Sequence, residues 1–307
     1  MKLLVLINAT AGSVSAKDCA GKVTAAFERH GVVPTIQLLQ GADIAAAARD
    51  FAKARSTSRG QAETTLVVGG GDGSISAAAG VLAGTDLPLG ILPLGTLNHF
   101  AKDLGLPLDV DQAADIIVAG RTRTIDVAEA NGRVFINNSS VGLYPFMVAR
   151  RNAHQRKSGM SKLLSTFPAM GETFRRATWH RLEIAAMGHH HPVRTPCIFV
   201  GNNRYEVGLA TFGTRLRLDC GELDIHVIRQ QNRLGILLLP FKIALGLVDR
   251  ERDVQVLRST ELEIVTRRRR SLRVSLDGEV VRMTMPLCYR SRPAALRVFC
   301  GAPKPRG

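Results

Sequence analysis

The stretch TLVVGGGDGSISAAAGVLA, residues 65–83, decides the fold class of this chain of 307 residues. Thr65–Val68 is a short apolar run rich in β-branched residues, which predicts a buried strand. Ser74–Ala83 is rich in alanine, which predicts a helix. Between them lies a glycine turn, Gly69–Ser74, with the sequence GGGDGS. A strand that passes through a tight turn directly into a helix is typical of a parallel α/β sheet.

Similar alternation extends over the first 125 residues. The expected strands are Leu3–Ile7, Val32–Leu39, Thr65–Val68 and Leu89–Leu92, and the expected helices are Ser15–His30, Ala42–Ala54, Ser74–Ala83, 97–104 and 110–119. This pattern predicts an α/β domain over residues 1–125, with a parallel sheet and helices on both faces.

After residue 125 the pattern changes, because strand-like runs follow one another directly. The expected strands are Thr124–Ala130, Val134–Ser140, Leu182–Met187, Pro196–Gly201, Leu223–Ile228, Glu261–Thr266, Leu272–Leu276 and Leu296–Phe299. Turn signals such as Asn131-Gly132 and Asp277-Gly278 separate them. We expect residues 126–307 to form a β-rich, mainly antiparallel domain, interrupted by helical segments near 143–177 and 234–248. Its last residues could pack back on the first domain.

The charge of the chain is concentrated in its second part. The chain has 41 Lys and Arg against 26 Asp and Glu, a net charge of +15. Residues 1–125 hold 11 of each, so the excess lies entirely within residues 126–307. This asymmetry indicates an anionic partner, namely phospholipid, nucleic acid or a phosphorylated substrate. With 15 aromatic residues and no recognised nucleic-acid motif, we do not expect nucleic acid.

Cysteine use and hydropathy exclude other classes. The five cysteines show no CxxC spacing, which predicts neither a disulfide framework nor a zinc site and fits a reducing compartment. The apolar run Leu234–Val248 is shorter than the roughly 20 residues a bilayer span needs. The N-terminus resembles a first strand and not a signal peptide. We therefore expect no membrane span.

The glycine turn Gly69–Ser74 predicts a phosphate site. Glycine allows positive φ and close backbone approach, and the helix that follows offers free N-terminal amides. Asp72 would repel a phosphate unless a cation bridges them, so it predicts Mg²⁺ or a contact with a sugar hydroxyl. The alternative is a tight turn with a solvated aspartate. Two more polar glycine turns, Asn8–Ser13 and Pro93–Phe100, also follow strands and would complete one phosphate and nucleoside pocket.

Four motifs now make a family recognisable: Asn8–Gly12, the GGDGS loop at 70–74, PLGTLN at 93–98 and DGE at 277–279. With them the chain resembles the diacylglycerol kinase catalytic-domain family, whose relatives include sphingosine and ceramide kinases. The resemblance implies a kinase that uses ATP and Mg²⁺ to phosphorylate a lipid hydroxyl. A kinase of a soluble nucleotide such as NAD stays open, as does a nucleotide- or nucleic-acid-binding protein without catalysis.

The resemblance also implies roles for particular residues. Glu279 would accept the proton of the lipid hydroxyl, and Asp72 would take part in catalysis. The residues implied to contact ATP are Asn8, Gly12, Gly69, Gly70, Gly71, Asp72, Gly73, Ser74, Ile75, Thr96 and Asn98.

The chain departs from the family pattern at two carboxylate positions. His99 stands where family members commonly have Asp, and an imidazole is a poor ligand for Mg²⁺. Asp103, one helical turn later, could replace it. Cys220 stands at a carboxylate of the family's structural magnesium loop, which leaves Asp219 as the metal candidate. An ordinary charged turn is the simpler interpretation of that loop.

Basic and apolar residues interleave over Phe146–Arg181 near a helical period, which suits either contact with an anionic membrane surface or a core helix with a basic solvent face. Together with the resemblance, this predicts a cytoplasmic protein that associates peripherally with the inner membrane face, where it meets its lipid substrate. A homodimer stays open. We expect His189–His191 to form a solvated turn and Arg267–Arg270 to form a solvated hairpin tip.

Overall fold

The computed structural model divides into two compact units. It describes residues 1–10, 15–57, 64–143, 178–186, 188–205, 215, 217–245, 247, 249, 252–266 and 269–301. The N-terminal unit comprises residues 1–127, 217–219 and 292–307, and the C-terminal unit comprises residues 128–216 and 220–291.

The N-terminal unit contains a parallel sheet with the strand order β2-β1-β3-β4-β16. Its strands are β1 (Lys2–Asn8), β2 (Thr35–Leu39), β3 (Thr64–Gly70), β4 (Leu89–Pro93) and the last part of β16 (Leu287–Phe299). The central strand β3 is buried along almost its whole length, because both faces of the sheet carry helices. The last residues of β16 lie beside β4, where Val298 is in register with Leu89.

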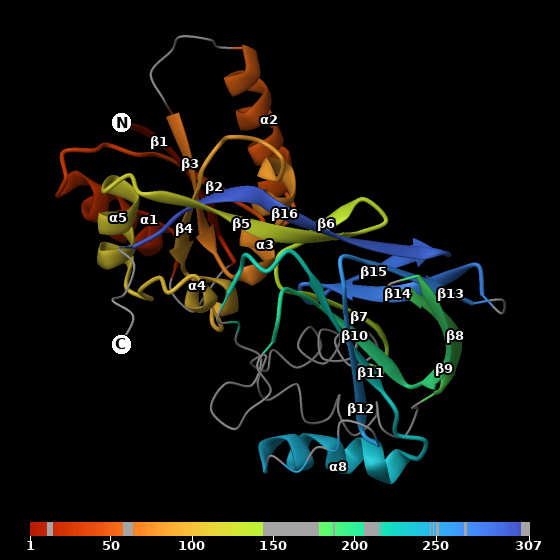
Figure 1. Ribbon diagram of the computed structural model, residues 1–307. Coiled ribbons are helices and arrows are strands. Elements are labelled where there is room, and N and C mark those ends of the chain that lie inside the picture. The colour runs from red at the N-terminus through yellow and green to blue at the C-terminus, as the bar shows by residue number, and fades with distance from the viewer. Residues whose placement is uncertain are drawn as a thin grey trace. The chain divides into compact units, whose positions relative to one another are not determined.

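Helices cover the two faces of this sheet in pairs: α1 packs with α5 on one face, and α2 packs with α3 on the other (Figure 1). The helices are α1 (Ala16–Glu28), α2 (Ile44–Thr57), α3 (Asp72–Leu82), α4 (His99–Asp103) and α5 (Val110–Val118). Phe27 of α1 and Ile117 of α5 are buried together against Leu3 and Leu92 of the sheet. Ser15 caps α1 by accepting a hydrogen bond from the amide of Asp18.

The C-terminal unit is built from antiparallel strands. One sheet has the order β12-β11-β10-β7-β14-β15, and a second group has the order β16-β13-β8-β9, with β6 beside the end of β5. The strands are β5 (Thr122–Ala130), β6 (Arg133–Phe135), β7 (Asn138–Gly142), β8 (His180–Ala186), β9 (His189–Thr195), β10 (Cys197–Asn202), β11 (Leu223–Ile228), β12 (Val254–Ser259), β13 (Glu261–Val265), β14 (Ser271–Leu276) and β15 (Glu279–Thr284). Phe135 and Tyr289 meet edge to face in its core, with ring centroids 6.3 Å apart.

This architecture confirms the predicted fold class, an α/β domain followed by a mainly antiparallel β-rich one. The structure also contains α8 (Arg233–Ala244), which overlaps most of the expected helix 234–248. None of the helices in the described ranges is long and apolar enough to cross a membrane. All five cysteines are free thiols, as their spacing predicted. The predicted basic segment at 143–177 lies outside the described residues, apart from Leu143.

Three local predictions were wrong. The run Val134–Ser140 is not one strand, because it breaks at 136–137 into β6 and β7. His189–His191 is not a turn but the start of β9, since the reversal is made by Gly188, which has a φ of 75°. As an edge strand, β9 tolerates Pro192. The strands β12, β15 and the first part of β16 were missed.

Candidate phosphate-binding site

The predicted phosphate loop joins β3 to α3, with Gly71 as the N-cap residue of the helix. Its φ of −87° is ordinary, and none of the four glycines in the loop has positive φ. Two of them are needed for close approach: a Cβ on Gly69 would lie 2.7 Å from the side chain of Leu94, and one on Gly70 would lie 2.8 Å from that of Ser74. Glycine therefore serves packing in this loop and does not serve a left-handed backbone.

The second glycine turn packs directly on the first. A Cβ on Gly95 would lie 2.4 Å from Cα of Gly71, so position 95 needs glycine for the two turns to touch. Asn98 holds this second turn together. Its Oδ1 accepts from the amide of Gly95 at 3.0 Å, and its Nδ2 donates to the carbonyls of Pro93 and Gly95 at 3.1 and 2.8 Å. With its side chain buried and fully bonded, Asn98 shapes the turn.

The predicted turn after β1, Asn8–Ser13, joins the same cluster through Asn8. Its Nδ2 donates to Oγ of Ser74 at 2.8 Å, which links the end of β1 to the first turn of α3. Its Oδ1 accepts from the amide and the hydroxyl of Thr10. The structure therefore brings the three predicted turns together at the carboxyl ends of β1, β3 and β4. Gly12, at the far end of the first turn, lies outside the described residues.

Asp72 has a structural task that the sequence did not indicate. Its carboxylate accepts from the amides of His99 and Phe100 at 3.2 and 2.9 Å, and so caps the N-terminus of α4. Asn98, the N-cap residue of that helix, makes no capping bond because its backbone is left-handed, with a φ of 51°. Asp72 thus fixes α4 against α3 and is not a solvated turn residue.

The groups that face solvent at this cluster define what a ligand could reach. No side chain caps α3, so the amides of Asp72 and Gly73 in its first turn are available to an anion, whereas the amide of Ser74 donates to the carbonyl of Gly71. Gly73 is exposed, and a Cβ there would meet no atom within 4 Å. Thr96 and His99 are also exposed. Ile75, by contrast, has its side chain in the core, and Gly69 and Gly70 are buried within β3.

In the C-terminal unit, the predicted DGE motif forms the turn between β14 and β15. Asp277 occupies a left-handed position, with a φ of 46°, and Glu279 begins β15 opposite Leu276. The carboxylate of Asp277 does not cap its own turn. It accepts from the amides of Ile136, Asn137 and Asn138 at 2.8 to 3.0 Å. Glu279 is exposed.

Sequence reasoning missed the residues that complete this network. Arg215 is 3% exposed, and it donates to the carbonyls of Ile136 and Asn202 at 2.6 and 3.0 Å and to Oδ1 of Asn137 at 2.7 Å. Asn202 also donates to the carbonyl of Ile136. Paired asparagines at 137–138 and 202–203, at the ends of strand-like runs, were the available signal. No sequence pattern pointed to Arg215.

The predicted metal candidate Asp219 is paired with an arginine. Its Oδ1 accepts from Nε of Arg217 at 2.9 Å, and this hydrogen bond holds the pKa of the Asp219 carboxyl below its usual range. The amide of Cys220 donates to Oδ1 of Asn203. Within the described residues, no group of three or more His, Cys, Asp or Glu side chains could hold a metal ion. The charged turn is thus the arrangement that these residues form.

Fold and turns together define a class: an α/β unit with three polar glycine turns at the carboxyl ends of its strands, followed by an antiparallel β unit. The model of the diacylglycerol kinase catalytic domain matches residues 2–130, and that of the YegS C-terminal NAD kinase β-sandwich-like domain matches residues 148–300. A Pseudomonas fluorescens protein named "Probable lipid kinase YegS-like" is 30% identical over 248 residues, which cover 76% of this chain and 77% of that protein. The chain belongs to this family of YegS-like lipid kinases.

Two further relatives cover the chain differently. A Mycobacterium tuberculosis protein named diacylglycerol kinase is 38% identical over 127 residues, 41% of this chain and 39% of that protein. The crystal structure of a diacylglycerol kinase from Bacillus anthracis str. Sterne is similar over 98% of this chain and 97% of that one, with a TM-score of 0.67 and 21% identity. At that identity the likeness concerns the fold alone.

Proposed function

We propose that this protein is a lipid kinase that transfers the γ-phosphoryl group of ATP to a lipid hydroxyl of diacylglycerol-like or sphingoid-like type. The observation that carries the proposal is the meeting of three polar glycine turns at the open N-terminus of α3. Ligands of open α/β sheets bind beyond the carboxyl ends of the strands, which is where these turns lie.

The residues of the three turns fit a nucleoside triphosphate. The first-turn amides of α3 and the helix dipole favour phosphate oxygens, and Gly73 lets the backbone approach them without obstruction. The hydroxyl of the exposed Thr96 lies on the neighbouring turn and can donate a hydrogen bond to the nucleotide. Asn8, Asn98 and Ser74 would act one step away, by holding the three turns in contact.

Mg²⁺ is the expected counter-ion of the phosphates, whose charge it neutralises during transfer. No protein-built cage for it exists within the described residues, so it would enter with ATP and retain several waters. Asp72 is the one carboxylate in the loop Gly69–Ser74. Both its oxygens already accept backbone amides, but each keeps a second lone pair for a metal or its waters.

The acceptor side would use Glu279. A lipid hydroxyl is almost un-ionised at neutral pH, so a group must take its proton as the phosphoryl group moves. Glu279 is exposed on the C-terminal unit, whereas neighbouring Asp277 is committed to three backbone amides. This leaves Glu279 as the carboxylate of the DGE motif able to act as general base.

Transfer of radiolabel from [γ-³²P]ATP to a panel of acceptors tests the proposal. The panel contains diacylglycerol, sphingosine and ceramide in mixed micelles, together with NAD as a soluble acceptor. We expect label in a lipid, and no label when Mg²⁺ is replaced by EDTA. Label in NAD alone would make the protein a soluble-nucleotide kinase. Absence of label from every acceptor, with ATP still bound, would favour a binding protein without catalysis.

A further inference from the structure

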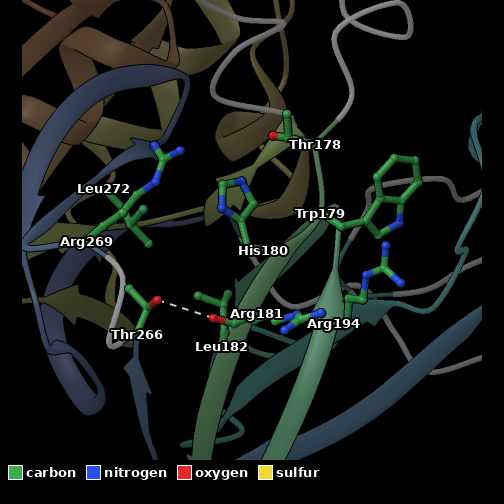
Figure 2. A pocket seen from close by; sticks show the side chains of 9 residues that line it. All are labelled: Thr178, Trp179, His180, Arg181, Leu182, Arg194, Thr266, Arg269 and Leu272. Atoms are coloured by element: carbon green, nitrogen blue, oxygen red, sulfur yellow. Dashed lines mark hydrogen bonds between the residues drawn. The ribbon is translucent and has the colours of Figure 1, made fainter.

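A hollow lies within the C-terminal unit at the ends of β8, β9, β13 and β14. Its volume is about 290 Å³, and an adjoining hollow of about 580 Å³ shares Thr178, His180, Arg269 and Leu272 with it. In Figure 2, Trp179 and Arg194 stand on one side of the first hollow and Arg269 on the other, with the ring of His180 between them. Together they are large enough for a polar headgroup.

Arginines line these hollows in pairs that repel each other. In the β8–β9 ladder Arg181 is directly opposite Arg194, and in the β14–β15 ladder Arg273 is directly opposite Arg282. Like charges directly opposite each other destabilise a sheet. Within the described residues, none of these four guanidinium groups is paired with a carboxylate; Arg282 donates only to Oγ of Ser271. The cost is uncompensated unless an anion joins them.

The described residues that line the hollows carry no negative charge, since no Asp or Glu is among them. Burial, together with the positive charge of Arg269, lowers the pKa of His180, so its ring is neutral at pH 7. A neutral imidazole offers a hydrogen bond in the middle of a ring of guanidinium groups. This combination suits a phosphate, which guanidinium groups can bind through two parallel hydrogen bonds.

The wall of the hollow continues into an apolar helix. Nε1 of Trp179 donates to the carbonyl of Gln230 at 2.7 Å, and Nε2 of Gln231 donates to the carbonyl of Arg194 at 3.0 Å. These glutamines lead directly into α8. On α8, Leu234 and Leu238 are 63% and 43% exposed, although the neighbouring Ile236 and Leu239 are buried. An apolar face therefore begins beside the basic hollow, as on proteins that lie in the bilayer interface.

We propose that the arginine hollow binds the phosphate headgroup of an anionic phospholipid while the exposed leucines of α8 enter the bilayer interface. This inference rests on the proposed function, because a kinase of a bilayer lipid must hold itself at the membrane. Charge complementarity supports it, since the net charge of +15 lies wholly in the second part of the chain.

Co-sedimentation with vesicles tests the inference. We expect the wild type to bind vesicles of phosphatidylglycerol and phosphatidylcholine, and to bind pure phosphatidylcholine only weakly. The double variant Arg194→Ala/Arg269→Ala should bind the anionic vesicles about 30-fold more weakly, at roughly fivefold for each arginine lost. The double variant Arg121→Ala/Arg133→Ala loses the same charge at exposed positions that line neither hollow and should bind within threefold of wild type.

Equal losses in the two double variants would overturn the inference, because bulk charge would then explain the binding. Because the hollow binds a phosphate group, we expect millimolar inorganic phosphate, at constant ionic strength, to displace the wild type from vesicles more than it displaces the arginine variant. Folding is not at risk, since Arg194→Ala removes a repulsive pair. We expect Leu234→Gln/Leu238→Gln to weaken vesicle binding as well. Unchanged binding would contradict insertion of α8.

The proposed function is tested separately on the same proteins. Phosphorylation of a short-chain diacylglycerol presented in detergent micelles needs no bilayer, so the arginine variant should keep at least half of the wild-type turnover there. If the wild type phosphorylates no lipid but still needs Arg194 and Arg269 for anionic vesicles, the kinase proposal fails and the headgroup site stands. If the wild type phosphorylates a lipid but the arginine variant binds anionic vesicles as tightly as the wild type does, the headgroup site fails and the kinase proposal stands.

Discussion

Asp277 and Arg215 both hydrogen-bond to the same short segment, residues 136–138. The carboxylate of Asp277 accepts the amides of residues 136–138, and the guanidinium of Arg215 donates to the carbonyl of Ile136 and the side chain of Asn137. The bend between β6 and β7 is thus fixed by two charged groups from distant parts of the chain. Because β7 pairs with both β10 and β14, this bend aligns the middle of the antiparallel sheet.

Replacing Asp277 should therefore destabilise the fold. Asp277→Asn keeps the size of the side chain and its tolerance of a left-handed backbone, but it presents an NH₂ group to an amide that needs an acceptor. We expect the free energy of unfolding to fall by about 2 kcal/mol, measured by urea denaturation. The neighbouring Glu279→Gln, which removes a charge of the same sign from an exposed side chain, should stay within about 0.5 kcal/mol of wild type. Equal effects at both positions would refute the structural role of Asp277.

The same Glu279→Gln variant tests the proposed general base. The amide cannot take the proton of the lipid hydroxyl, so turnover should fall by a factor on the order of 10² or more. ATP affinity, measured by calorimetry, should barely change. A variant with nearly wild-type turnover would move the search to the 98–103 turn, and loss of activity in His99→Ala or Asp103→Asn would then identify the base.

Two glycines allow the phosphate loop to be tested with its own control. A Cβ at Gly73 meets no protein atom within 4 Å, so Gly73→Val should leave stability unchanged to within about 0.5 kcal/mol and yet lower ATP affinity about tenfold or more. Gly95→Val should lower both, because its side chain separates the two turns. ATP affinity unchanged in Gly73→Val would mean that the triphosphate does not lie on the first turn of α3.

Asp72 combines a cap with its proposed place beside the metal and phosphates. Asp72→Asn should cost about 1 kcal/mol of stability through weaker capping of α4, as well as most of the phosphoryl transfer. Urea denaturation and turnover at saturating Mg-ATP separate the two effects. Lost stability with full turnover would reduce Asp72 to a capping residue.

Asp253 gives a prediction for acid pH. It is almost fully buried and accepts from Nζ of Lys242 at 2.9 Å through both oxygens. Burial alone would raise the pKa of this carboxyl, but Lys242, the amide of Asp249 and Gln230 together hold it below its usual range. The unfolded chain then binds the proton more tightly, so this contribution to stability is present above about pH 4 and is lost as the pH falls through the folded pKa.

Unfolding measured from pH 2 to pH 6 should show this loss in the wild type, and Asp253→Asn should flatten it. The variant should be less stable than wild type near pH 6, and the difference should shrink as the pH falls. A constant difference across this range would mean that Asp253 keeps its ordinary pKa.

The N-terminal unit was the part most accessible to prediction, because its signals are local. Strand, glycine turn and helix follow one another within residues 65–83, and the carboxyl ends of parallel strands must meet. The role of Asp277 was not accessible, since its partners lie about 140 residues away and no pattern near 277 names them. Strand β9 was missed for a related reason: its histidines and Pro192 carry no alternating hydrophobic signal, and only pairing with β8 makes them a strand.

The N-terminal unit is not a continuous piece of the chain, and this has a consequence for its synthesis. Its sheet includes the end of β16, whose Val298 pairs with Leu89, and the carbonyl of Ala295 accepts from the amide of Gly84. A ribosome that has made residues 1–127 has therefore not yet made the last strand of that sheet. One edge of β4 stays unpaired while some 165 further residues are translated. Until β16 is in place, the unpaired edge of β4 is therefore a site where newly made chains can aggregate.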